Sequence, residues 1–310
     1  MNRNVCLPQD VLSTRIRSLS RRLQPEPAGR ETVLNGVGTL KAVVFDIYGT
    51  LVMGGPGELG AQAGVRRAIA CAGAVAACRL HSRPLPEGLG AAGSEAFRAA
   101  VSAEHRCMRL DAETDVPEID VRTVWKAVLP QLTEAGWLCE TPDDDGIERF
   151  AVEFECRSNP VWPMPHAAET IGRLRENGLQ LGIVSNAQFF TPLLFQAFMN
   201  QAPEDIGFDP HLCVYSFQRG IAKPSQVLFD LLADRLAARD IQPGQTLYVG
   251  NDMLNDILPA SRCGWKTVLF AGDRRSLRLR EGHPGCSAIA PDAVLTSLDE
   301  LMELVRTDSR

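Results

Sequence analysis

The stretch KAVVFDIYGTLV, residues 41–52, decides the fold of this chain. Its first five residues are mostly β-branched or aromatic, which is typical of a strand buried on both faces of a sheet. Asp46 ends this run, and Gly49 and Thr50 follow as turn and cap residues. An aspartate at the carboxyl end of a buried parallel strand lies where open α/β sheets bind their ligands. Taken alone, Asp46 is more simply explained as a cap, but three stretches further along the chain favour a functional role.

The composition is that of an ordinary globular protein. Of 310 residues, 45% are hydrophobic and 23% are charged, and the chain is long enough for one large or two smaller domains. The net charge of −6 argues against a general affinity for nucleic acid or for anionic membranes. No apolar run approaches the roughly 20 residues that a membrane-spanning helix needs. We therefore expect a small-molecule substrate, with neither nucleic acid nor a membrane as a partner.

The cysteines point to a reducing compartment. There are nine, an odd number, and they are scattered without a Cys-x-x-Cys pair. No secretory signal precedes them, so reduced thiols are expected rather than a disulfide framework. The sequence thus predicts a cytoplasmic protein, and it does not indicate an oligomeric state.

Residues 1–38 are expected to form an N-terminal extension without strands. Leu12, Ile16, Leu19 and Leu23 recur at helical spacing, with arginines between them. Such a basic amphipathic segment fits a transit peptide or a membrane-surface helix. The interpretation we favour is simpler: the apolar stripe packs on the domain that follows.

Residues 56–159 are expected to form a helical unit inserted behind the first strand. A glycine-rich connection at 53–60 is suited to a hinge or a flap. Apolar residues at helical spacing over 121–132 predict a helix with Asp120 as its N-cap, and Pro130 should end or kink it. A second stripe over 147–154 predicts another helix.

Residues 39–55 and 160–310 are expected to form the α/β core. After residue 160, short apolar runs alternate with helical patterns, which predicts a parallel sheet with helices on both faces. The predicted strands are 41–45, 179–184, 212–215, 246–249, 266–270 and 293–295.

Polar side chains follow four of these strands. They are Asp46, Ser185 with Asn186, Lys223, and the pair Asp252 and Asp256. Because the carboxyl ends of parallel strands share one edge, these residues can converge. An aspartate with a lysine, small donors and two further carboxylates suits nucleophilic displacement on an anionic substrate, with a divalent metal offsetting the charge repulsion.

In order and context, these residues resemble the four motifs of the haloacid dehalogenase-like (HAD) hydrolase superfamily. The motifs are Asp46-x-Tyr48-Gly49-Thr50, Ser185-Asn186, Lys223-Pro224 and Asp252-x-x-x-Asp256. The helical insert after the first motif is similar to that superfamily's cap domain. The resemblance covers residues 41–270 and implies a Rossmann-like core with an inserted helical cap.

The resemblance also implies roles for single residues. Asp46 would be the nucleophile that forms an aspartyl-enzyme intermediate, with Tyr48 and Lys223 beside it in the catalytic group. The substrate would be bound by Thr50, Ser185, Asn186 and Lys223. A Mg²⁺ ion would be held by Asp46, Tyr48, Asp252 and Asp256.

Tyr48 departs from the phosphatase pattern. HAD phosphatases usually carry a second aspartate at this position as general acid and base, whereas the superfamily's haloacid dehalogenases have a tyrosine. Halide release needs no proton, while an alkoxide is a poor leaving group without an acid. Those dehalogenases, however, need no metal, have small polar residues in place of Asp252, and hold the halide with a cap arginine. The candidates for that arginine are Arg66, Arg67, Arg98, Arg106 and Arg109.

Motif one therefore favours a dehalogenase and motif four a Mg²⁺-dependent phosphohydrolase. We favour the phosphohydrolase acting on a small phosphorylated substrate, because acids beside a nucleophilic carboxylate need a cation to neutralise them. The alternatives are a metal-independent 2-haloacid dehalogenase and a catalytically weak binding or regulatory protein with the same fold.

Overall fold

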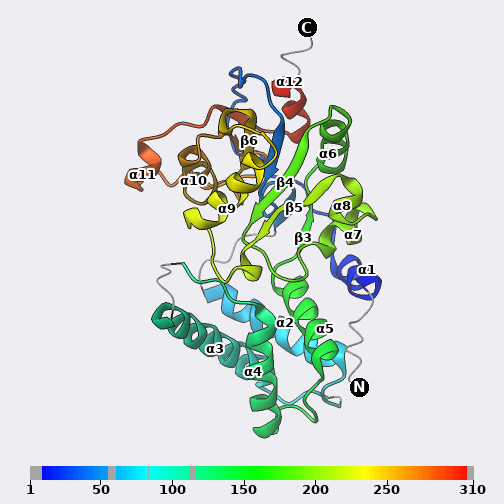
Figure 1. The fold of residues 1–310 in the computed structure, drawn as a ribbon. Helices are drawn as coiled ribbons and strands as arrows, with labels where there is room; N and C mark the ends of the chain where they lie inside the picture. The colour runs from blue at the N-terminus through cyan, green and yellow to red at the C-terminus, as the bar shows by residue number, and fades with distance from the viewer. Residues whose placement is uncertain (1–8, 55–60, 83, 112–115, 306–310) are drawn as a thin grey trace. The chain divides into compact units, whose positions relative to one another are not determined.

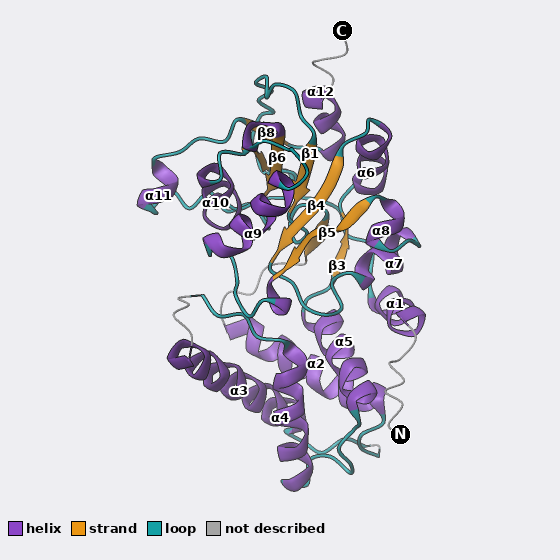
Figure 2. Cartoon of the chain, viewed as in Figure 1, coloured by secondary structure: helices purple, strands orange, loops and turns teal. Residues whose placement is uncertain are grey.

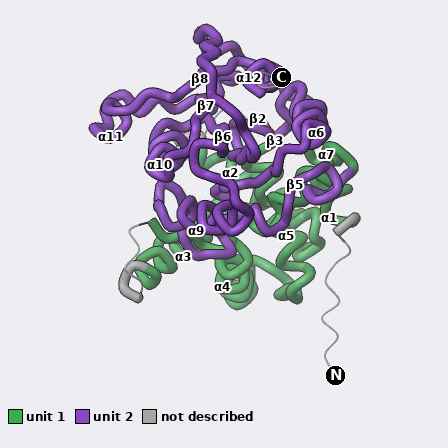
Figure 3. The backbone as a smooth tube through the Cα atoms, turned by 45° about the horizontal axis from the view of Figure 1, so that its top comes forward, with its two compact units in different colours: residues 1–21, 56–160, 188–200 green, residues 22–55, 161–187, 201–310 purple. Residues whose placement is uncertain are grey.

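The computed structural model describes residues 9–54, 61–82, 84–111 and 116–305. The chain divides into two compact units, which Figure 3 shows in different colours. Unit 1 comprises residues 1–21, 56–160 and 188–200, and unit 2 comprises residues 22–55, 161–187 and 201–310. The predicted glycine-rich hinge lies largely outside the described residues, since positions 55–60 are not among them.

Unit 2 is built on a six-stranded parallel sheet with the order β5-β4-β1-β6-β7-β8. This confirms the predicted fold class. The first strand, β1, lies between β4 and β6, with Phe45 opposite Ile183 and Val249. The strands are β1 (Ala42–Phe45), β4 (Gln180–Ser185), β5 (Phe208–Tyr215), β6 (Thr246–Gly250), β7 (Lys266–Phe270) and β8 (Ala293–Leu295).

Helices cover both faces of this sheet. Figures 1 and 2 show α9 and α10 on one side and α6 with α12 on the other. Between α9 and the sheet, Val44, Val184 and Leu232 are fully buried in one apolar cluster. The helices of unit 2 are α6 (Ala167–Glu176), α8 (Pro203–Ile206), α9 (Gln226–Ala237), α10 (Leu258–Arg262), α11 (Pro284–Ser287) and α12 (Leu301–Val305).

A short antiparallel ribbon brackets the helical insertion in the sequence. It pairs β2 (Val52–Gly54) with β3 (Val161–Pro163), with Met53 opposite Trp162. The backbone N–H of Met164 also donates to the carbonyl of Leu51, 2.9 Å away. The chain therefore leaves unit 2 and returns to it through two segments that are hydrogen-bonded to each other.

Unit 1 is helical and has an aromatic core. The Trp125 ring stacks on Phe97 at 4.7 Å between centroids and contacts Phe150 and Phe154 edge-on. Such aromatic pairs add to the stabilisation from burying apolar area. The helices are α1 (Gln9–Leu19), α2 (Ala61–Cys78), α3 (Leu89–Asp111), α4 (Val121–Glu134), α5 (Asp144–Ser158) and α7 (Leu193–Met199).

Helix α4 begins as predicted but does not end where predicted. The Asp120 side chain accepts a hydrogen bond from the backbone N–H of Arg122, as an N-cap should. Of the two outcomes predicted for Pro130, an end of the helix does not occur, since α4 continues to Glu134, and a kink stays a prediction. Pro130 removes the bond to the carbonyl of Lys126, which lies on the exposed face of the helix, where water can replace it. The buried stripe on the opposite face holds the last turn in place.

Helix α1 packs its apolar stripe within unit 1, against α5 and α7. Leu12 and Ile16 are buried, and Arg15 forms an ion pair with Glu153. Glu153 has no exposed side-chain area and also accepts from Arg157 at 2.9 Å, so two cations neutralise one buried carboxylate. This supports the packing interpretation of the N-terminal segment.

The predicted domain boundaries stay a prediction, although the residues of the expected insertion lie in unit 1.

In the described part of the chain, eight cysteines are present as free thiols. No helix there combines the length and the apolar character needed to cross a bilayer.

Candidate active site

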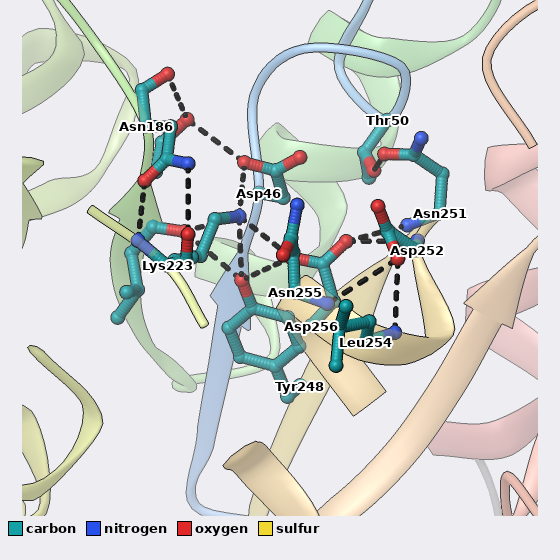
Figure 4. Close-up of polar contacts among 12 residues, drawn as sticks. Asp46, Thr50, Asn186, Lys223, Tyr248, Asn251, Asp252, Leu254, Asn255 and Asp256 are labelled. Carbon is teal, nitrogen blue, oxygen red and sulfur yellow. Dashed lines mark hydrogen bonds and ion pairs between the residues drawn. The ribbon is translucent and has the colours of Figure 1, made fainter. Parts of the chain in front are cut away.

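Asp46 lies immediately after β1, with its side chain only 8% exposed. Its backbone N–H donates to the carbonyl of Val249 on β6, 3.0 Å away, so the residue is held to the neighbouring strand. Its Oδ1 accepts from the hydroxyl of Ser185 and from the ammonium of Lys223, each 2.8 Å away. Among the described residues none donates to Oδ2, which carries no dashed line in Figure 4. One oxygen is therefore fixed and the other is left open for chemistry.

Lys223 is the central cation of the site. Its side chain is 3% exposed, and its ammonium lies 2.8 Å from Asp46 Oδ1 and 2.6 Å from Asp256 Oδ1. Burial alone would lower the pKa of Lys223, but the charges of Asp256 and Asp46 outweigh it and raise the pKa above its ordinary value. Lys223 therefore stays charged and neutralises one of the two carboxylates.

Asp256 is 1% exposed, and protein donors occupy both of its oxygens. Oδ2 accepts from the backbone N–H groups of Asn251 and Asp252, at 3.0 and 2.9 Å. Oδ1 lies within 3.1 Å of the Tyr248 hydroxyl and 2.6 Å of Lys223. Burial raises the pKa of Asp256 to about 6, although its ion pair with Lys223 opposes this. Burial also raises the pKa of Tyr248 well above its ordinary value, so that hydroxyl remains protonated.

Ser185 and Asn186, which end β4, have different partners. The Ser185 hydroxyl donates to Asp46. The Asn186 side chain instead bonds to the backbone of Lys223, accepting from its N–H at 2.7 Å and donating to its carbonyl at 3.4 Å. Asn186 thus fixes the loop that carries the lysine, and its predicted contact with substrate remains a prediction.

Asp252 points its carboxylate at Arg280. The guanidinium Nε lies 3.1 Å from Oδ1 and Nη2 lies 2.7 Å from Oδ2. Oδ1 also accepts from the backbone N–H groups of Leu254 and Asn255, which makes Asp252 the cap of the following helical turn. The hydrogen-bond partners of the Asp252 carboxylate therefore differ from those of Asp46 and Asp256.

Tyr48 and Thr50 lie in the turn that follows Asp46. Tyr48 is half-buried and forms an isolated bridge with Val52. The Thr50 hydroxyl is buried and donates to Asn251 Oδ1 at 3.3 Å. The structure thus joins Asp46, Ser185 and Lys223 with Asp256 in one hydrogen-bonded cluster, while the polar contact of Thr50 is to Asn251.

The three carboxylates predicted to bind Mg²⁺ do not fit a metal ion as they are arranged, and Tyr48 as a ligand stays a prediction. Both oxygens of Asp252, both of Asp256 and Oδ1 of Asp46 accept from protein donors. Across the described residues, no group of three or more His, Cys, Asp or Glu side chains is placed to hold a metal. Mg²⁺ binds through oxygen ligands, and of these six carboxylate oxygens only Asp46 Oδ2 is open. We therefore derive no step through a metal.

Three residues of the site were missed in the sequence. Tyr248 is a polar residue inside a predicted buried strand, and Asn251 lies just after that strand. The positions of these two residues could therefore have marked them as candidates for the site. Asn251 Nδ2 donates to the carbonyl of Ser276 at 2.7 Å, which ties the site to a distant loop. Arg280 carried no sequence signal, because only the fold brings it to Asp252.

Comparisons with known proteins indicate the family and the fold. A family model described as haloacid dehalogenase-like hydrolase matches residues 40–264. A ribulose-1,5-bisphosphate 5-phosphatase of Halopiger xanaduensis is 28% identical over 144 residues, covering 46% of this chain and 56% of that relative. A glyceraldehyde 3-phosphate phosphatase of Pyrococcus furiosus is 23% identical over 209 residues, covering 62% of this chain and 80% of that relative. The first of these matches thus spans little more than half of the relative's length.

Among solved structures, the defluorinating L-2-haloacid dehalogenase Rha0230 is similar, with a TM-score of 0.50 and 15% identity over 93% of this chain and 100% of that one. At such identity the likeness concerns the fold alone. The family match spans the strand that carries Asp46 and the strand ends that carry Ser185, Lys223 and Asp256. The chain belongs to the haloacid dehalogenase-like hydrolase family and is a hydrolase.

Proposed function

We propose that this protein is a phosphohydrolase that uses Asp46 as a nucleophile on a small phosphorylated substrate. The observation that supports this best is the asymmetry of the Asp46 carboxylate. Lys223 and Ser185 fix Oδ1, while Oδ2 is open at the end of β1. The curated relatives named above are phosphatases of small sugar phosphates, which favours a substrate of that class.

The proposed reaction has two displacements. Asp46 Oδ2 attacks phosphorus, the bond from phosphorus to the leaving oxygen breaks, and a phosphoaspartate forms. Water then attacks phosphorus, which releases inorganic phosphate and restores the carboxylate. The single hydrogen of the Ser185 hydroxyl is donated to Asp46 Oδ1, so in this arrangement the positive charge of Lys223 is what stabilises the phosphoryl oxygens. With Tyr48 at the usual acid position, the leaving group takes its proton from solvent.

The charged groups around Asp46 leave the site with a net negative charge. Asp46 and Asp256 carry two negative charges against the single positive charge of Lys223, while Asp252 and Arg280 neutralise each other. A phosphate dianion entering a site of net negative charge requires additional positive charge. The Mg²⁺ that the family resemblance implies would supply it, but the carboxylates predicted to hold that ion are occupied by protein donors as they are arranged, so the Mg²⁺ requirement stays a prediction.

A second candidate function is the hydrolysis of a short 2-haloacid. It is favoured by Tyr48 and by the Arg280–Asp252 pair, which leaves one carboxylate fewer for a metal. Here Asp46 Oδ2 would displace halide from carbon, and water would hydrolyse the resulting ester.

Side-by-side assays separate the two candidates. We would measure phosphate release from p-nitrophenyl phosphate and chloride release from 2-chloropropionate, each with Mg²⁺ and with EDTA, and use Asp46→Asn as the control. The proposal expects turnover of the phosphate ester, and loss of that turnover in the control. Chloride release that resists EDTA, with an inert phosphate ester, would establish the second candidate instead. The small-molecule substrate and the cytoplasmic location stay predictions.

A further inference from the structure

Arg280 and Asp252 form a complete two-point ion pair. The guanidinium Nε and Nη2 each donate to a different carboxylate oxygen, at 3.1 and 2.7 Å. This fork-to-fork geometry is specific to arginine, because an ammonium group cannot contact both oxygens in the same way. The Asp252 side chain is 9% exposed and that of Arg280 is 39% exposed, so the pair borders solvent.

The loop that carries Arg280 is bound to the loop that carries Asp252. The backbone N–H of Arg278 donates to the carbonyl of Asn251, and the N–H of Met253 donates to the carbonyl of Arg278, each at 2.9 Å. These two bonds form an isolated parallel bridge between Asp252 and Arg278. Arg280, two residues further on, therefore reaches Asp252 from a fixed backbone.

The same loop is anchored at its beginning and strained at Arg280. The buried Asp273 carboxylate accepts three side-chain hydrogen bonds from Arg275, with Nη2 2.8 Å from Oδ2. Arg280 itself has a φ of 54°, in the left-handed region that residues other than glycine seldom occupy. A non-glycine residue keeps such a conformation when the surrounding structure holds it there.

We propose that Arg280 is a positioning residue that keeps the Asp252 carboxylate from binding a divalent cation. The guanidinium occupies both carboxylate oxygens, and its charge repels any cation that approaches them. A cation that uses Asp252 must first displace Arg280, so the ion pair lowers the apparent affinity by the fraction of time that it is open. The proposal concerns the site of the proposed function, but it does not depend on which substrate is turned over.

The test measures the binding of Mn²⁺ to the whole protein. Binding is monitored by titration calorimetry and by the loss of the electron paramagnetic resonance signal of free Mn²⁺. Arg280→Gln opens the pair and should raise the affinity about tenfold. Arg280→Lys keeps the charge without the fork and should raise it by less. The matched control is Arg278→Gln, which removes a charge from the same loop. The Arg278 side chain donates to the carbonyls of Arg275 and Leu277, so its loss should change the affinity less than twofold.

A double variant shows whether Asp252 is the group released. Adding Asp252→Asn to Arg280→Gln should return the affinity to the wild-type value or below. Circular dichroism and thermal unfolding check that each variant is folded. If Arg280→Gln does not fold, Arg280→Lys takes its place in the binding measurement.

Equal affinities for Arg280→Gln and Arg278→Gln would overturn the proposal, as would a gain that survives Asp252→Asn. Because binding is measured without substrate, an inactive protein whose Mn²⁺ affinity follows these expectations would refute the proposed function and leave this inference standing.

Discussion

Replacing Lys223 by methionine should destabilise unit 2 strongly. Methionine keeps much of the length of the side chain but removes the ammonium that lies 2.8 Å from Asp46 and 2.6 Å from Asp256. All three side chains are at most 8% exposed, so water does not replace the lost partner. Removing one member of a buried ion pair typically costs about 3–5 kcal/mol, because a buried charge is left uncompensated. Here two carboxylates lose the same cation.

The Asp256→Asn substitution provides the second half of a double-mutant cycle. It leaves one negative charge facing the cation, so in that background Lys223→Met should cost several kcal/mol less than in the wild type. The assay is urea unfolding followed by tryptophan fluorescence, since Trp265 of unit 2 stacks near Tyr248 at 6.2 Å between ring centroids. With a slope of about 1–3 kcal/mol per molar urea, the Lys223→Met midpoint should fall by at least about 1 M.

Two results would refute this reasoning. One is a Lys223→Met midpoint equal to that of the wild type. The other is a double variant whose loss of stability is the sum of the two single losses, because additivity would mean that the charges do not interact.

Three further outcomes are expected. The Asp256 carboxyl binds its proton more tightly in the folded protein, with a pKa of about 6 against 3.8 for an ordinary group. Deprotonation of Asp256 should therefore lower the free energy of unfolding by about 3 kcal/mol as pH rises from about 4 to 6. Urea unfolding at a series of pH values measures this dependence, and Asp256→Asn should abolish it. Tyr48→Asp should raise phosphatase activity on alkyl phosphates more than on aryl phosphates, since only alkoxides need an acid; equal gains on both substrates would contradict this. Asp46→Asn should lower turnover by at least about a thousandfold with an unchanged urea midpoint, whereas a loss within about tenfold would remove Asp46 from the nucleophile role.

The sheet was readable because its strands are short, apolar and separated by turns. The predicted ranges 266–270 and 293–295 coincide with β7 and β8, since each is a compact run bounded by polar or turn residues. The first half of β5 was missed, because Asp209, Pro210 and His211 interrupt the apolar pattern. The start of α4 followed from Asp120, a local cap that depends on its immediate neighbours alone.

The clustering of Asp46, Ser185 and Lys223 was also predictable, because parallel strands end at a common edge. What sequence could not supply were contacts that depend on the path of a loop. Arg280 reaches Asp252 across 28 residues, through a bridge that no periodicity marks. Residues 188–200 likewise belong to unit 1 although their neighbours on both sides belong to unit 2. Such assignments depend on tertiary packing, which a local pattern does not encode.

The most direct test of the central claim is a single turnover in ¹⁸O-labelled water. An excess of enzyme is mixed with a phosphorylated substrate, quenched in acid and digested, and the peptide that contains Asp46 is weighed by mass spectrometry. We predict a phosphorylated Asp46 at short times, which then disappears as ¹⁸O enters the released phosphate and none enters the aspartate. If turnover of a 2-haloacid instead places ¹⁸O from the water in Asp46 itself, water has attacked the carbonyl carbon of an aspartyl ester and the protein is a dehalogenase. If neither the phosphoryl group nor the label ever appears on Asp46, this residue is not the nucleophile.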